Sequence, residues 1–115
     1  MKVRVTVFAL AALFALIAVS VWATGHQTIT PALRELAANP AGNSWFIATL
    51  FDAYFGFLWF WLWVAYKETG WIARIVWLVL ILALGNIAMA GYMLIQLSRL
   101  PAGAKIEDLL LRRAA

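Results

Sequence analysis

The chain has 115 residues, of which 66% are hydrophobic and only 12% are charged. Soluble domains carry about 25% charged residues, and most of a small domain is surface, so this composition excludes an ordinary soluble fold. The formal charge of +4 comes from scattered basic residues with no run that would follow a phosphate backbone, so no nucleic-acid partner is expected.

The first apolar segment covers residues 5–23 and contains no charged residue. A bilayer span takes about 20 apolar residues, so we expect a membrane helix here. A cleaved signal peptide is the alternative, because Lys2 and Arg4 precede the apolar run and Val-Trp-Ala ends it. The apolar run exceeds the about 15 residues of a usual signal core, which favours a retained helix.

Two shorter stretches predict helices that lie on the membrane surface. In the loop of residues 24–44, Thr30 and Pro31 are typical of an N-cap and a first helical position. The tail of residues 101–115 has three apolar residues at helical spacing, Ile106, Leu109 and Leu110, and two arginines near its end, Arg112 and Arg113. Both stretches fit amphipathic interfacial helices.

Two further apolar segments cover residues 45–66 and 75–97, and a very short connection joins them. They should form a tight antiparallel hairpin, with ion pairs among Lys67, Glu68 and Arg74 at the turn. The predicted fold is therefore an all-α membrane protein with three transmembrane helices, forming a single unit over residues 1–115.

The orientation of three such spans is poorly determined by charge. With the N-terminus inside, four basic residues are cytoplasmic and five are outside, so the positive-inside rule does not decide. Because the first helix often dominates, we expect a cytoplasmic N-terminus and an external C-terminus in a bacterial cytoplasmic (inner) membrane.

One carboxylate, Asp52, lies inside the second apolar segment, where insertion of a charge costs up to about 2.5–3.5 kcal/mol. At 100° per residue it shares a helix face with four other candidate binding residues: Thr49, Gly56, Trp59 and Trp63. The predicted hairpin puts Asn86 at nearly the same depth. We therefore expect an Asp52–Asn86 contact, either as a clasp between helices or as part of a ligand site.

Eleven of the seventeen aromatic residues lie between Trp45 and Tyr66. They form either a belt that faces lipid or the wall of a site for a flat apolar molecule, such as a lipid, quinone or carotenoid. With a single histidine, His26, and no cysteine, a protein-only metal site is not expected.

Residues 45–97 resemble a family of short bacterial integral membrane proteins of unknown function. The resemblance rests on the stretches "FDAYFGF", "YKE" and "GNIA". It implies three spanning segments and a shared pattern at Asp52, Gly56, Glu68, Gly85 and Asn86. It implies no activity, cofactor or catalytic residue.

Small size, short loops and an aromatic helix favour a non-enzymatic membrane protein. We expect an accessory subunit of a larger membrane complex, with other subunits or copies of itself as partners, or a binder of a lipid-like cofactor. The alternative is a membrane-embedded enzyme, of cyclase or isomerase type, that acts on an isoprenoid or other lipid with Asp52 as general acid.

Overall fold

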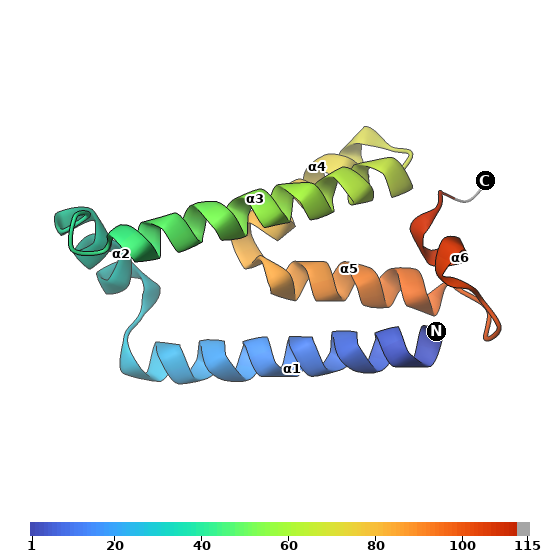
Figure 1. The fold of residues 1–115 in the computed structure, drawn as a ribbon, viewed down its shortest axis with the longest axis horizontal. Helices are drawn as coiled ribbons and strands as arrows, with labels where there is room; N and C mark the ends of the chain where they lie inside the picture. Colours follow the sequence, from blue (N-terminus) through green and yellow to red (C-terminus); the bar gives the residue numbers. More distant parts are fainter. Residues whose placement is uncertain (113–115) are drawn as a thin grey trace.

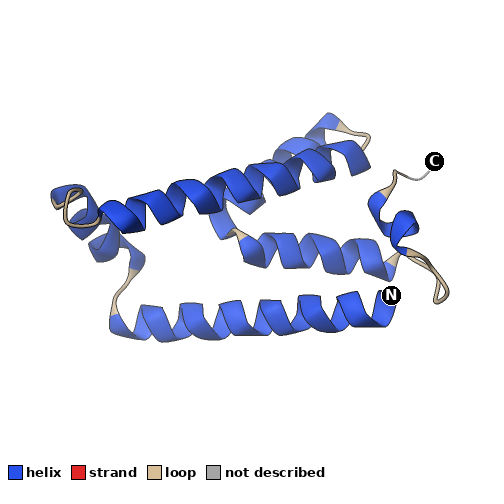
Figure 2. Cartoon of the chain, in the orientation of Figure 1, coloured by secondary structure: helices blue, strands red, loops and turns tan. Residues whose placement is uncertain are grey.

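The computed structural model describes residues 1–112, which form six helices (Figure 1). These are α1 (Lys2–His26), α2 (Ile29–Ala38), α3 (Ser44–Lys67), α4 (Trp71–Leu84), α5 (Asn86–Ser98) and α6 (Ile106–Leu110). This part of the chain contains helices, turns and loops but no strand (Figure 2). The all-α prediction is therefore confirmed.

Two of the helices, α1 and α3, are long and apolar enough to cross a membrane. They have 25 and 24 residues, which at 1.5 Å per residue makes each about 36 Å long. They contain the predicted segments of residues 5–23 and 45–66. No side chain other than Ala9 in α1 and Val64 in α3 is buried, so neither is the core helix of a soluble fold.

The loop between them contains α2, as predicted, but the helix begins earlier than expected. Thr28 is the N-cap and Ile29 is the first helical residue, so the predicted N-cap at Thr30 is wrong. Pro31 then occupies the third helical position, where its missing N–H is still one of the donors without an intrahelical acceptor. Proline is therefore tolerated at a position beyond the first.

The third apolar segment is not the single helix predicted over residues 75–97. It breaks at Gly85, whose backbone has φ 59° and ψ −128°. Residues other than glycine rarely adopt these backbone angles, because a Cβ atom makes them strained. A Cβ at this position would also lie 2.8 Å from the ring of Phe57. Both the backbone angle and the close approach of Phe57 thus require glycine.

After this break the chain turns back instead of continuing. In Figure 1, α4 runs along α3 to about its middle, and α5 then returns between α1 and α3. The Tyr54 hydroxyl donates to the Leu82 carbonyl (3.3 Å), which places the end of α4 beside the first half of α3. At the other end, Lys2 Nζ donates to the Leu100 carbonyl (2.8 Å). The end of α5 therefore lies beside the start of α1, whereas three successive spans would separate them.

The core lies where α3, α4 and α5 meet, and Tyr92 is its centre. This side chain has no exposed surface. Its ring makes edge contacts with Trp77 (4.8 Å between centroids), Trp63 (5.6 Å) and Phe60 (6.2 Å). Such edge-to-face pairs are favourable for aromatic rings. The three helices are therefore packed around a single aromatic residue.

The tail helix α6 is docked on the protein. Leu109 is 2% exposed and packs against Leu97 and Leu100. A helix lying only on a membrane surface would not bury this side chain against its own chain. Arg113, included in the predicted tail, lies outside the described residues.

Candidate functional site

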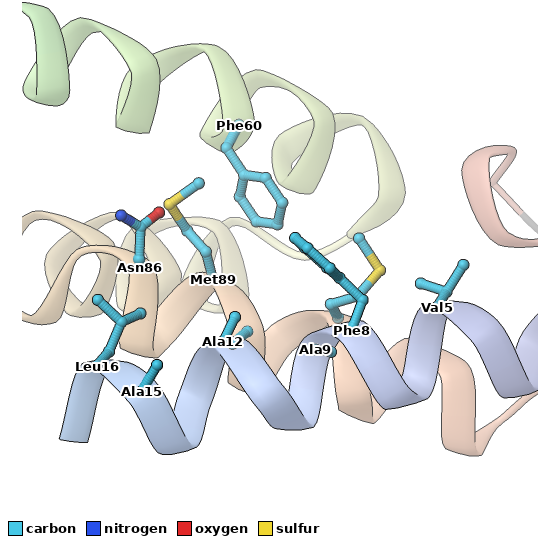
Figure 3. Close-up of a pocket in the computed structure, with 11 residues that line it drawn as sticks. Val5, Phe8, Ala9, Ala12, Ala15, Leu16, Phe60, Asn86 and Met89 are labelled. Atoms are coloured by element: carbon cyan, nitrogen blue, oxygen red, sulfur yellow. The ribbon is translucent and has the colours of Figure 1, made fainter. Parts of the chain in front are cut away.

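An apolar groove of about 450 Å³ lies between α1, α3 and α5 (Figure 3). Its volume is within the range of about 300–1,000 Å³ typical of small-molecule sites. The lining includes Ala9 and Ala12 from α1, Phe60 from α3, and Met89, Ala90 and Met93 from α5.

Small residues explain why the space is present. Ala9, Ala12 and Ala15 recur every three residues along α1, so they fall near one face of the helix. Ala90 lies on the facing helix. Methyl side chains fill little of the volume between two helices. Met89 and Met93 form flexible, polarisable walls that adapt to an apolar guest.

Asn86 is the one amide among the groove-lining residues. It is the first residue of α5, and its amide lies beside Met89 and Leu16 in Figure 3. Among residues 1–112 its side chain has no hydrogen-bond partner. The groove thus offers an apolar path with one donor-acceptor group, which suits a molecule with an uncharged oxygen.

Asp52 lies elsewhere, on the exposed side of α3. The pairings of Tyr54 with Leu82 and of Trp61 Nε1 with the Arg74 carbonyl (2.9 Å) set the α3–α4 register. That register puts Asp52 level with the break at Gly85, which directly precedes Asn86. Within the described chain, however, no hydrogen bond joins Asp52 to Asn86. Helix α3 instead directs Phe57 toward Gly85 and Phe60 toward Tyr92.

Asp52 and the four candidate binding residues that were predicted to share its helix face lie in two different surroundings. Thr49 and Gly56 are exposed with Asp52, and Trp59 is 73% exposed. Trp63 is partly buried, and its Nε1 donates to the Leu110 carbonyl (2.9 Å). The hydroxyl of Thr49 donates to the Trp45 carbonyl (2.8 Å) within its own helix. Trp63 therefore belongs to the packed part of the chain, while the other four form an outer surface.

The predicted turn residues form a network of hydrogen bonds. Arg74 Nε donates to the Glu68 backbone carbonyl (3.0 Å), and the Glu68 carboxylate accepts a bond from the Tyr92 hydroxyl (3.1 Å). Lys67 Nζ donates to the carbonyls of Leu109 (2.6 Å) and Leu111 (3.1 Å). The turn thus connects α3 and α4 with both α5 and the tail.

Sequence reasoning missed the groove and the central role of Tyr92. The alanines of "ALAALFALIA" carry the spacing that would have indicated a slim helix face. Nothing in the sequence showed that this face meets α5. No group of three possible metal-ligating side chains was found within residues 1–112.

Comparison with known proteins gives one match. The model of a family described as "Protein of unknown function (DUF1475)" matches residues 3–114. No curated protein matches the chain, and no solved structure does. The match covers nearly the whole chain, more than the residues 45–97 that carried the resemblance.

Proposed function

The chain belongs to this family of unknown function, and we propose that it is a membrane protein that holds one lipid-like molecule in the groove of α1, α3 and α5. The observation that carries the proposal is the groove itself: about 450 Å³, apolar, with the single amide of Asn86.

Placement in a membrane is supported by what α1 and α3 expose. Large apolar side chains face outward along both helices, including Phe14 (75% exposed), Trp45 (84%) and Trp59 (73%). Water would solvate such a surface poorly, whereas lipid tails would solvate it well.

The α4–α5 pair fits a hairpin that enters the membrane only part-way. At 1.5 Å per residue each helix is about 20 Å long, short of the about 30 Å hydrocarbon core. Irregular backbone at membrane depth is tolerated where protein covers it. Gly85 is buried, its N–H donates to the Ile81 carbonyl and its own carbonyl accepts from the Met89 N–H. The break therefore leaves neither backbone group of Gly85 unpaired.

The returning path of α4 and α5 also bears on the orientation in the membrane, which the count of basic residues in the sequence left undecided. Seven basic residues lie at the end of the molecule that holds the start of α1: Lys2, Arg4, Lys67, Arg74, Arg99, Lys105 and Arg112. Among the described residues only Arg34, in α2, lies at the other end. The positive-inside rule then favours a cytoplasmic location for the start of α1 and for the end of α5. We therefore propose a cytoplasmic N-terminus, as expected for an inner-membrane protein, and a cytoplasmic location for residues 99–112 in place of the expected external C-terminus.

The chemistry of the groove favours an apolar molecule that carries a carbonyl or hydroxyl oxygen. The groove runs from Val5, near the proposed cytoplasmic surface, to Asn86 at the depth of the break. A quinone or a similar isoprenoid would place its tail against the alanines and an oxygen at the amide. A pure hydrocarbon would leave the amide without a partner, which is costly in an apolar site.

An enzymatic role with Asp52 as general acid lacks support from this arrangement. A general acid must come within hydrogen-bond reach of the group that it protonates. Asp52 is not among the groove-lining residues, and those residues include no carboxylate. We therefore propose a binding protein and not a cyclase or isomerase.

Mass spectrometry of the protein purified in mild detergent tests the proposal. The wild type should retain roughly one lipid-like molecule per chain, identified after solvent extraction. Ala12→Phe should displace it, because the new ring fills the groove. Ala11→Phe is the matched control, since the neighbouring Ala11 is exposed and does not line the groove. If wild type and Ala12→Phe carry the same lipids in the same amounts, the groove does not bind them.

A further inference from the structure

The outer surface of α3 carries a second feature, a row of exposed residues that do not line the groove. Asp52, Thr49, Phe55, Gly56 and Trp59 are all exposed and follow one side of the helix; we call them the Asp52 face. The opposite side of α3 packs against α4 and α5. The Asp52 face is therefore left uncovered by the described part of the chain.

Asp52 has no partner for its charge within residues 1–112, where it makes no hydrogen bond or ion pair. It lies eight residues from Ser44, the first residue of α3, and thus about 12 Å along a helix that we place in the membrane. An isolated carboxylate at that depth is unfavourable, and such residues almost always face protein or water and pair with another group.

We propose that the Asp52 face docks a membrane-spanning helix of another protein, and that this helix carries a lysine or arginine opposite Asp52. The charge of Asp52 sets the chemistry of the partner, because an opposite charge offsets the loss of solvation. The proposal rests on the membrane placement of α3 but not on the occupant of the groove.

The shape of the face also suits a helix. A Cβ at Gly56 would meet no atom within 4 Å, so the space beside it is open and another backbone can come close. Phe55 (59% exposed) and Trp59 (73% exposed) border the carboxylate with large rigid side chains. Aromatic residues of this kind often dominate binding between proteins.

A second copy of the chain fits less well. Two Asp52 faces brought together would place two carboxylates side by side. The apolar stretches of α1 and α3 contain no lysine or arginine at that depth, since Lys2, Arg4 and Lys67 lie at the helix ends. A different protein with a basic residue in its span therefore matches the face better.

Photo-crosslinking in native membranes tests the proposal. A photoreactive phenylalanine replaces Phe55 on the face or, as control, Phe14 on α1, which is 75% exposed. The Phe55 probe should form a protein adduct that the Phe14 probe does not. The partner should have a spanning helix with a lysine or arginine within about one turn of the cross-linked residue, since basic side chains are long.

Two variants then test the role of charge and of shape. Asp52→Asn should reduce the adduct at least about tenfold, as removal of one member of a desolvated charge pair does. Gly56→Leu should reduce it without any change of charge. Asp52→Lys should abolish it, and a lysine- or arginine-to-aspartate change in the partner should restore it.

Adducts to lipid alone, to a second copy, or to a helix without a basic residue at that depth would overturn the proposal. So would an adduct that Asp52→Asn leaves unchanged. The lipid content of the groove should be the same in Asp52→Asn as in the wild type. The proposal for the Asp52 face and the proposal for the groove can therefore be refuted independently of each other.

Discussion

The two ends of the molecule are built differently. At the closed end, which holds the start of α1 and the ends of α3 and α5, bonds join distant parts of the chain: Lys2 with Leu100, Trp63 with Leu110, and Lys67 with Leu109. At the open end, which holds the end of α1, α2 and the start of α3, the side-chain bonds are local. They join Thr24 to Ser20 and Thr49 to Trp45, each four residues apart.

The difference follows from the break at Gly85. Because α4 and α5 reach only about half-way along α3, helices α1, α3, α4, α5 and α6 meet at the closed end, and among the described helices only α1, α2 and α3 extend through the open end (Figure 1). Stability is therefore expected from the closed end. The groove begins there and ends at the depth of the break, and Asp52 lies level with the break, so both proposed binding surfaces reach the depth at which packing becomes incomplete.

Removal of the Tyr92 side chain should have the largest effect. Tyr92→Ala leaves a cavity among Trp63, Trp77 and Phe60 and should lower the free energy of unfolding by about 3–5 kcal/mol. Tyr92→Phe is the control: it keeps the ring contacts and loses only the bond to Glu68, at a cost of about 0.5–1.5 kcal/mol. Unfolding in mixed detergents measures both, and equal losses would contradict a packing role for the ring.

A side chain at Gly85 should have the next largest effect. Gly85→Ala forces a backbone conformation that suits glycine and pushes a methyl group toward the ring of Phe57. We expect a loss of about 2–4 kcal/mol in the same unfolding assay. Adding Phe57→Leu should recover part of that loss by relieving the clash. A fully stable Gly85→Ala protein would mean that the segment does not break at this residue.

Loss of the hydrogen bonds that hold the tail should have a smaller effect on stability. Lys67→Met keeps an unbranched side chain but removes the bonds of Nζ to the carbonyls of Leu109 and Leu111, so the free energy of unfolding should fall by about 1 kcal/mol. Hydrogen exchange should rise in residues 106–112, and exchange in α1 and α3 should stay the same. Unchanged exchange in the tail would show that Lys67 does not hold it.

Substitutions at the open end should have the smallest effect. Thr49→Ala removes a bond within α3 and an exposed hydroxyl, so the unfolding free energy should change by less than about 0.5 kcal/mol. A loss as large as that of Lys67→Met would erase the contrast between the two ends.

Much of this architecture could be predicted from sequence, because length and hydropathy determine which segments become apolar helices. The extents of α1 and α3 and the short α3–α4 turn follow from these properties. The direction of Asp52 does not. Residues 45–66 are apolar around almost their whole circumference, so no amphipathic pattern fixes the rotation of the helix.

The break at Gly85 could not be deduced from hydropathy, since residues 75–97 read as one apolar run. The Gly-Asn pair at residues 85 and 86 was the only local signal for a turn. The groove depends on the pairing of α1 with α5, which are more than 60 residues apart along most of their contact. Such long-range pairing leaves no mark in a local pattern.

Cysteine accessibility tests the central claim, that the third apolar segment returns to the side from which it enters. The chain has no cysteine, so single substitutions can be labelled without background. Three exposed positions suffice: Ala41 in the loop before α3, Thr69 in the α3–α4 turn, and Ala102 after α5. Each variant is treated with a membrane-impermeant maleimide in intact cells and in inside-out vesicles.

We predict that Ala102→Cys and Thr69→Cys react from the same, cytoplasmic side, and that Ala41→Cys reacts from the other. Three complete spans would instead place Ala102→Cys with Ala41→Cys. That result would contradict the returning hairpin and the charge distribution that rests on it.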